Sequence, residues 1–476
     1  MSKACQFFSY FSFLCLLQYF FCVIKYSDNS KFLKGICLMK IAFFKSKITP
    51  EIGAFLAGYC FDDKSNSIAD DLFMDGLCVD DGERKVLIIS FDLLGLDEWY
   101  IKEVRKKCAD ILGTDEANVL FSCTHTHSGP ESRTMACIPE QLNVAYLENL
   151  KEQILQEIKD LLTKDWIECT VSFYSMQCNE NLNRRYVTVD NRASFMPHWK
   201  AMVPLCTQFR DDELSLLFFW KKNERGTTVP AYVIGNFAAH PLAGRTPGEG
   251  AFRISADFPG VFRDYVTSET GAGCMFITGA AGDMVPKNDE QGREAVREMG
   301  LNLGRAAIFG MVGAERNTKR FVFKDPKVGG MIRSFEQPLR LAYRNNPKKL
   351  PAPYLGKDTV TLEIQCVSIG DFCIVGVPGE LCAELGQEIK WHTPFKKAMI
   401  AYNSTAYFSY MGPANFLVSG GYEGLSQRFS ARGGLALVQT AVDAMFDLRE
   451  ELYPTDPEAG EFYPDCNPME LIANER

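Results

Sequence analysis

Short apolar runs typical of buried strands alternate along this chain with segments whose apolar residues recur at helical spacing. Residues 86–91 and 119–123 are nearly continuous apolar runs, which favour strands buried on both faces. Between them, apolar residues recur every three or four positions across residues 101–111, and Gly113 follows as a helix C-cap. Residues 147–161 repeat the helical spacing, which predicts a second, longer helix.

Two hairpins are predicted in the remainder of the chain. Residues 216–220 and 229–236 flank a polar loop, and residues 360–369 and 372–377 flank a turn at Gly370. Antiparallel hairpins combined with strand–helix alternation predict an α/β fold made of layered, mixed sheets.

The ends of the chain differ from its centre. Residues 5–24 are almost wholly apolar, which is typical of a signal peptide or a membrane anchor. No A-x-A-like cleavage site follows them, whereas a regular globular pattern begins at Met39. The predicted divisions are an apolar extension (1–38), a globular domain (39–452) and an acidic, proline-containing tail (453–476). The favoured interpretation is that Met39 is the true start and the protein is cytoplasmic; the alternatives are membrane anchoring or secretion through residues 1–24.

The charge and the cysteines narrow the classes of function. The chain has a formal net charge of −9, and an acidic surface repels phosphate backbones, so nucleic acid is not expected as a partner. The 17 cysteines are scattered without C-x-x-C pairs, which argues against zinc fingers and against a compact disulfide framework. Buried thiols in a reducing compartment explain them best, in agreement with a cytoplasmic protein.

Five segments share one design, in which an apolar strand runs into a loop of small or polar residues. They are residues 119–130, 232–241, 274–286, 372–380 and 399–410. Ligand sites in α/β folds lie at the carboxyl ends of strands. The sequence therefore predicts that these loops meet around one pocket.

The first loop contains His125 and His127, two of only five histidines in the chain. In an extended backbone, side chains two residues apart point the same way. Imidazole is a common zinc ligand, although two histidines in a loop can also serve only as hydrogen-bonding groups. The motif alone leaves both interpretations open.

Four further loop residues have a structural interpretation when each is taken singly. His240 is then a loop histidine, Glu380 a carboxylate at a helix N-terminus, Tyr410 a core aromatic residue and Asp283 a turn residue. A catalytic zinc, however, needs about three N/O ligands and one open position. His125, His240 and Glu380 supply that set, which favours a metal site.

These motifs, in this order, resemble the catalytic domain of the neutral ceramidase family from Ile41 to Ala431. Its opening is similar to Lys47-Ile48-Thr49-Pro50 followed by Leu56-Ala57-Gly58-Tyr59, and its most specific signature resembles Thr124–Pro130. The resemblance implies a layered α/β catalytic domain and a zinc site with the ligands His125, His240, Glu380 and Tyr410. It also implies three active-site residues beside the metal: His127, Arg184 and Tyr422.

Two departures from the family concern the substrate. The family's ceramidases carry a serine in a Gly-Asp-x-Ser-Pro segment, and Val285 stands at that position here. The chain also ends before the point where those enzymes have a C-terminal β-sandwich domain. We therefore expect a substrate other than long-chain ceramide.

The expected function is zinc-dependent hydrolysis of an amide or ester bond in a small N-acyl or O-acyl compound. A water activated by zinc attacks the carbonyl, His127 moves the proton, and Arg184 and Tyr422 steady the oxyanion. The alternatives are a catalytically silent metal-binding or ligand-binding homologue and a different zinc amidohydrolase, such as one built on a TIM barrel. Membrane contact is expected only if the extension is part of the protein.

Overall fold

The computed structural model describes residues 39–58, 63–134, 141–187, 193–195, 209–244, 252–287, 292–320, 326–347, 350 and 352–454. All of them belong to one structural unit. The extension 1–38 and the tail beyond residue 454 lie outside the described residues, so the predicted domain boundaries stay predictions. Within the described ranges, no helix is both long enough and apolar enough to cross a membrane.

The largest element is an eight-stranded mixed sheet, which confirms the predicted fold class. Its strands, in spatial order, are β13 (Gly273–Thr278), β11 (Thr228–Phe237), β10 (Glu213–Lys222), β6 (Ile167–Gln177), β1 (Met39–Lys47), β3 (Phe73–Asp80), β4 (Lys85–Phe91) and β5 (Val119–Cys123). Only the two outer pairs, β13–β11 and β4–β5, are parallel. The continuous apolar runs predicted as strands form β4 and β5, which are buried almost throughout.

A second sheet contains β15 (Val328–Pro338), β16 (Thr359–Ile369), β17 (Phe372–Gly376) and β19 (Lys397–Ala401), in that order. β16 and β17 form the predicted hairpin, and Gly370 at its turn has a positive φ of 58°. β17 and β19 are parallel, so their carboxyl ends lie at the same edge.

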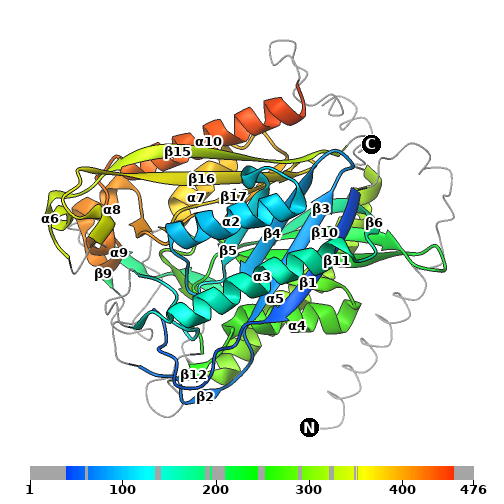
Figure 1. Ribbon diagram of the computed structural model, residues 1–476, viewed down its shortest axis with the longest axis horizontal. Helices are drawn as coiled ribbons and strands as arrows, with labels where there is room; N and C mark the ends of the chain where they lie inside the picture. The colour runs from blue at the N-terminus through cyan, green and yellow to red at the C-terminus, as the bar shows by residue number, and fades with distance from the viewer. Residues whose placement is uncertain are drawn as a thin grey trace, which may run out of the picture. The chain divides into compact units, whose positions relative to one another are not determined.

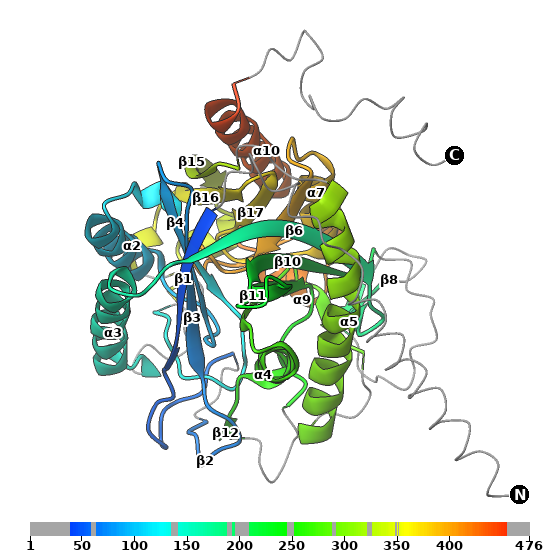
Figure 2. The same ribbon diagram turned by 90° about the vertical axis from the view of Figure 1, so that its right-hand side faces the viewer.

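Helices cover the two sheets in three groups (Figures 1 and 2). The groups are α2 (Glu98–Leu112) and α3 (Val144–Leu162) against β1 and β5, α4 (Asp257–Thr270) and α5 (Arg293–Arg320) against β6, β10 and β13, and α7 (Ala383–Trp391) and α10 (Gly433–Leu452) against the second sheet. Each group buries its own apolar cluster. α2 ends, as predicted, at Gly113 in the left-handed conformation.

Short elements complete the fold around the strand ends. They are the pairs β2 (Ser67–Ile68) with β12 (Arg253–Ile254), β7 (Asn181–Asn183) with β14 (Met284–Pro286), β8 (Arg185–Val187) with β9 (Ala193–Phe195) and β18 (Glu380–Leu381) with β20 (Tyr410–Met411), the helices α6 (Leu341–Arg344), α8 (Ala414–Ser419) and α9 (Gly421–Ser426), and the 3-10 turns η1 (Glu116–Asn118) and η4 (Ala352–Tyr354).

The carboxyl ends of β5, β13 and β19 meet. Thr278 ends β13. Its hydroxyl donates to the carbonyl of Thr124 at 2.7 Å, and its main-chain carbonyl accepts from the amide of Tyr402 at 3.0 Å. Because Thr124 follows β5 and Tyr402 follows β19, the loops after these strands start from one place. The structure therefore brings together the loops that the sequence predicted to share a pocket.

Candidate metal centre

His125 follows β5 in a turn, with a positive φ of 70°. Its amide donates to the carbonyl of Leu93 at 2.9 Å, which holds this uncommon conformation. A left-handed conformation costs a residue with a side chain about 1–2 kcal/mol. The expectation of an extended H-x-H segment is therefore wrong in its backbone, although the rings of His125 and His127 still lie 5.0 Å apart.

The His125 ring is oriented by the main chain. Its Nδ1 lies 2.7 Å from the carbonyl oxygen of Leu94, an acceptor that places the ring proton on Nδ1. The lone pair is then on Nε2, for which the described residues supply no hydrogen-bond partner. This Nε2 lies 3.5 Å from Oε2 of Glu380.

His240, three residues beyond β11, is arranged in the same way. Its Nδ1 lies 3.1 Å from the carbonyl oxygen of Met284, and its Nε2 lies 3.2 Å from Oε2 of Glu380. Burial, together with the nearby Arg184 guanidinium, lowers the pKa of His240 to about 4. The ring is therefore neutral at pH 7, the form that binds metals.

Glu380 lies in β18, where it is the register partner of Tyr410 in β20. Tyr407 donates its hydroxyl to Oε1 at 2.6 Å, and Tyr402 donates to Oε2 at 3.1 Å. Burial acts to raise the pKa of Glu380, but the neighbouring histidine rings outweigh it and hold the pKa well below its usual range. The carboxylate is thus ionised.

This donor set fits a metal ion. Two imidazole lone pairs aimed at one carboxylate oxygen are unfavourable unless a cation lies among them. In a tetrahedral zinc site, neighbouring ligand atoms are about 3.3 Å apart, given zinc–ligand bonds of about 2.0–2.1 Å. The two Nε2–Oε2 distances are 3.2 and 3.5 Å. One ring nitrogen from each of His125, His127 and His240 also lies within 4.8 Å of the others, so a three-histidine set is geometrically available too.

Tyr410 extends the site toward Arg184. Its hydroxyl accepts from Nη2 of Arg184 at 3.1 Å, and the same Nη2 donates to the carbonyl of Gly282 at 2.9 Å. Nε of Arg184 donates to Glu423 at 2.6 Å. The Tyr422 ring lies 5.3 Å from that of Tyr410 and is 45% exposed, so it forms the solvent side of this group.

Asp283 does more than form the predicted turn. Its carboxylate accepts from the Asn183 side chain at 2.7 Å and from the amide of Ala383 at 2.8 Å, which ties β7 to the first residue of α7. Burial raises the pKa of Asp283 to about 6. Val285, two residues later in β14, is buried, with 2% of its surface exposed.

Sequence reasoning missed several residues of the site. Tyr402 and Tyr407 bind Glu380, and Asn403 places its side-chain nitrogen 2.9 Å from Nδ1 of His125. Several tyrosines follow β19 in the sequence, and this pattern could have pointed to Tyr402 and Tyr407, but only Tyr410 was predicted to belong to the site. Glu423, the residue after Tyr422, was not predicted to belong to the site.

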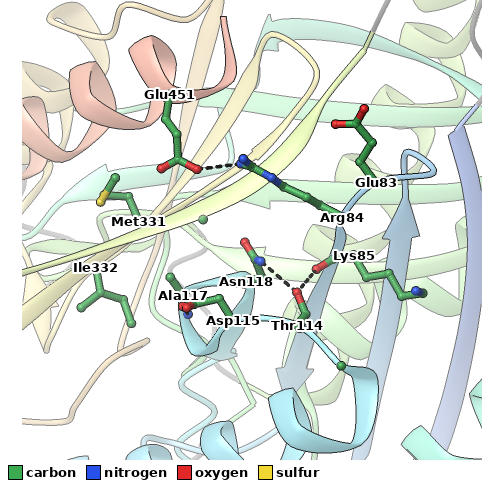
Figure 3. A pocket seen from close by; sticks show the side chains of 12 residues that line it. Glu83, Arg84, Lys85, Thr114, Asp115, Ala117, Asn118, Met331, Ile332 and Glu451 are labelled. Carbon is green, nitrogen blue, oxygen red and sulfur yellow. Dashed lines mark hydrogen bonds and ion pairs between the residues drawn. The ribbon is translucent and has the colours of Figure 1, made fainter.

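A separate cavity of about 620 Å³ lies away from this site (Figure 3). The β3–β4 turn, the segment from Gly113 to η1, β15 and the end of α10 line it. Arg84 and Glu451 form an ion pair of 2.8 Å across its rim. None of the candidate site residues borders this cavity.

Comparison with known proteins shows the fold. No protein-family model and no curated protein matches the sequence. Among solved structures, the neutral ceramidase from Pseudomonas aeruginosa superposes with a TM-score of 0.69 at 18% identity, over 87% of this chain and 75% of that chain. A ceramidase described as complexed with C2 gives 0.67 at 17% identity, over 87% of this chain and 76% of that one. The chain thus has a neutral ceramidase-like fold, as the sequence motifs implied.

Proposed function

We propose that this protein is a zinc-dependent hydrolase that cleaves an amide or ester bond in an acyl compound. The observation that carries the proposal is the convergence of His125 Nε2 and His240 Nε2 on one oxygen of Glu380, with both Nδ1 atoms turned to main-chain carbonyls. Such outer contacts fix the tautomer of a metal-binding histidine. The similarity in fold to ceramidases, which are hydrolases, supports the same conclusion.

His125, His240 and Glu380 would hold the metal, with Tyr410 as a fourth ligand. The mixture of imidazole and carboxylate donors suits zinc. When bound, zinc lowers the pKa of water to about 7 and polarises a carbonyl group.

His127 is placed to move a proton. Its ring lies 5.6 Å from that of His240. The residue as a whole is partly exposed, unlike His125 and His240, while both of its ring nitrogens are buried. Burial, with the neighbouring His125 and His240 rings, lowers the pKa of His127 well below its ordinary value. The ring is therefore neutral at pH 7 and ready to accept a proton, which it can return to the leaving group.

Arg184 supplies fixed positive charge to the site. Burial opposes that charge, but Tyr410 and Glu423 outweigh it and raise the pKa of Arg184 well above its ordinary value. A buried, oriented cation stabilises negative charge that develops on a carbonyl oxygen. Tyr422, at the solvent side, would add a hydroxyl donor.

The substrate is proposed to be an acyl compound other than long-chain ceramide. Val285 has no hydroxyl to attack or to donate a hydrogen bond, so chemistry must rely on the metal and on His127. Val285 also favours a second candidate, a metal-binding protein without turnover. The TIM-barrel alternative is wrong, because most neighbouring strands of the eight-stranded sheet are antiparallel.

An activity screen tests the proposal. Zinc-loaded protein is offered a panel of N-acyl and O-acyl compounds beside the His240→Ala variant. Turnover by the wild type that the variant lacks supports the hydrolase. Stoichiometric zinc without any turnover would favour the silent metal-binding protein instead.

A further inference from the structure

Three short helices close to Arg184 each carry an exposed apolar side chain. Leu341 on α6 is 80% exposed, Val418 on α8 is 77% exposed and Leu425 on α9 is 64% exposed. We call Leu341, Val418 and Leu425 the apolar rim. Side chains of this kind that lie together on a surface mark an interaction site more often than scattered ones do.

The three helices form one continuous surface, and α6, α8 and α9 lie beside one another in Figure 1. The hydroxyl of Tyr343 in α6 donates to the carbonyl of Leu425 in α9. Arg340, just before α6, donates to the carbonyl of Gly424 at 2.8 Å. α8 and α9 are joined directly at Gly420.

The rim is attached to the candidate site. Arg185 donates to the Ser419 hydroxyl and to the carbonyl of Gly420, both at 3.0 Å, and so holds the α8–α9 junction. Arg185 and Arg184 share the carboxylate of Glu423 in α9. Anything that docks on the rim is therefore placed beside Tyr422, the exposed residue on the solvent side of the candidate site.

The segments around the apolar rim differ in charge from the chain as a whole. Among the described residues of 339–358 and 411–435, five lysines and arginines outnumber two carboxylates, in a chain whose net charge is −9; they are Arg340, Arg344, Lys357, Arg428 and Arg432 against Asp358 and Glu423. One of the two carboxylates, Glu423, is buried against the two arginines. The described residues of these two segments therefore carry a net positive charge, with Lys357 and Arg432 exposed.

We propose that the apolar rim docks on the surface of a lipid bilayer that contains anionic phospholipid. Apolar side chains that enter the interface and cations that face anionic headgroups are the two requirements for such peripheral binding. A second copy of the chain fits poorly, because it would bring like charges face to face. The inference does not depend on the proposed hydrolase activity.

Vesicle partition of the full chain tests the proposal. The probes are vesicles of phosphatidylcholine alone and of phosphatidylcholine with phosphatidylserine. We expect binding to the second kind that weakens as salt rises. The variant Leu341→Glu/Val418→Glu/Leu425→Glu should bind about tenfold or more weakly, because three apolar contacts are replaced by like charge.

The matched control is Phe309→Glu, which alters an apolar side chain that is 70% exposed on α5. It should bind vesicles as the wild type does. Hydrogen exchange locates the contact independently of residues 1–38: anionic vesicles should slow exchange in residues 414–426 and leave α5 unchanged. Unchanged exchange in residues 414–426, or equal binding by the triple variant and the wild type, would overturn the proposal. His240→Ala should bind vesicles normally, which separates this test from that of the metal centre.

Discussion

Main-chain carbonyls orient the two candidate histidine ligands, whereas the two neighbouring arginines share one carboxylate. Nδ1 of His125 faces Leu94 O, and Nδ1 of His240 faces Met284 O. Arg184 and Arg185 both depend on the carboxylate of Glu423.

The two halves of the site should therefore tolerate substitution differently. Main-chain carbonyls move only if the backbone moves, so we expect the histidines to keep their orientation when neighbouring side chains are replaced. The arginine side contains one shared anion, and its loss affects both cations at once. We expect replacement of Glu380 to affect function most, followed by His127, Glu423 and Tyr407.

Replacing Glu380 should have the largest effect. Glu380→Ala removes the oxygen on which both Nε2 atoms converge, and even outer-shell changes at metal sites cost about 10–100-fold in affinity. We expect zinc affinity to fall by more than this and activity to become unmeasurable. Competition with a chelator measures the zinc affinity. His392→Ala, at the exposed C-cap of α7, is the matched control and should behave as wild type.

His127→Ala should retain zinc and lose activity by about 10²–10⁴-fold, the usual contribution of a general acid–base group. Metal content and turnover are measured on the same preparation. Loss of zinc in this variant would instead make His127 a ligand, as the three-histidine set allows.

Glu423→Gln should leave zinc bound and lower activity by less than His127→Ala does. Breaking a buried ion pair typically costs about 3–5 kcal/mol of stability, because the partner cation stays buried. We expect a clear fall in the free energy of unfolding, measured in urea. Glu388→Gln on α7 is the control; an equal loss of stability there would contradict a special role for Glu423.

Tyr407→Phe should have the smallest effect of the four. It removes one hydroxyl donor to Glu380 and leaves the ring, so zinc affinity should fall about tenfold. Tyr402→Phe removes the other donor and provides the matched comparison. No change in chelator competition for either variant would mean that these hydroxyl groups do not support the ligand.

The sequence predicted the meeting of the strand-end loops because parallel strands deliver their carboxyl ends to one edge. It could not predict the positive φ of His125, which depends on a contact with Leu93 made only after folding. The role of Glu423 was also hidden, since its arginine partners lie more than 200 positions away in the chain. Contacts of that range carry no local pattern that could be read from the sequence.

The proposed function depends on a zinc ion held by His125, His240 and Glu380. X-ray absorption at the zinc edge, with elemental analysis of the purified chain, detects this ion and its ligands. We predict one zinc per chain with nitrogen and oxygen ligands at about 2.0–2.2 Å. Full zinc content in His125→Ala, His240→Ala and Glu380→Ala alike, or sulfur ligands near about 2.3 Å, would contradict the account.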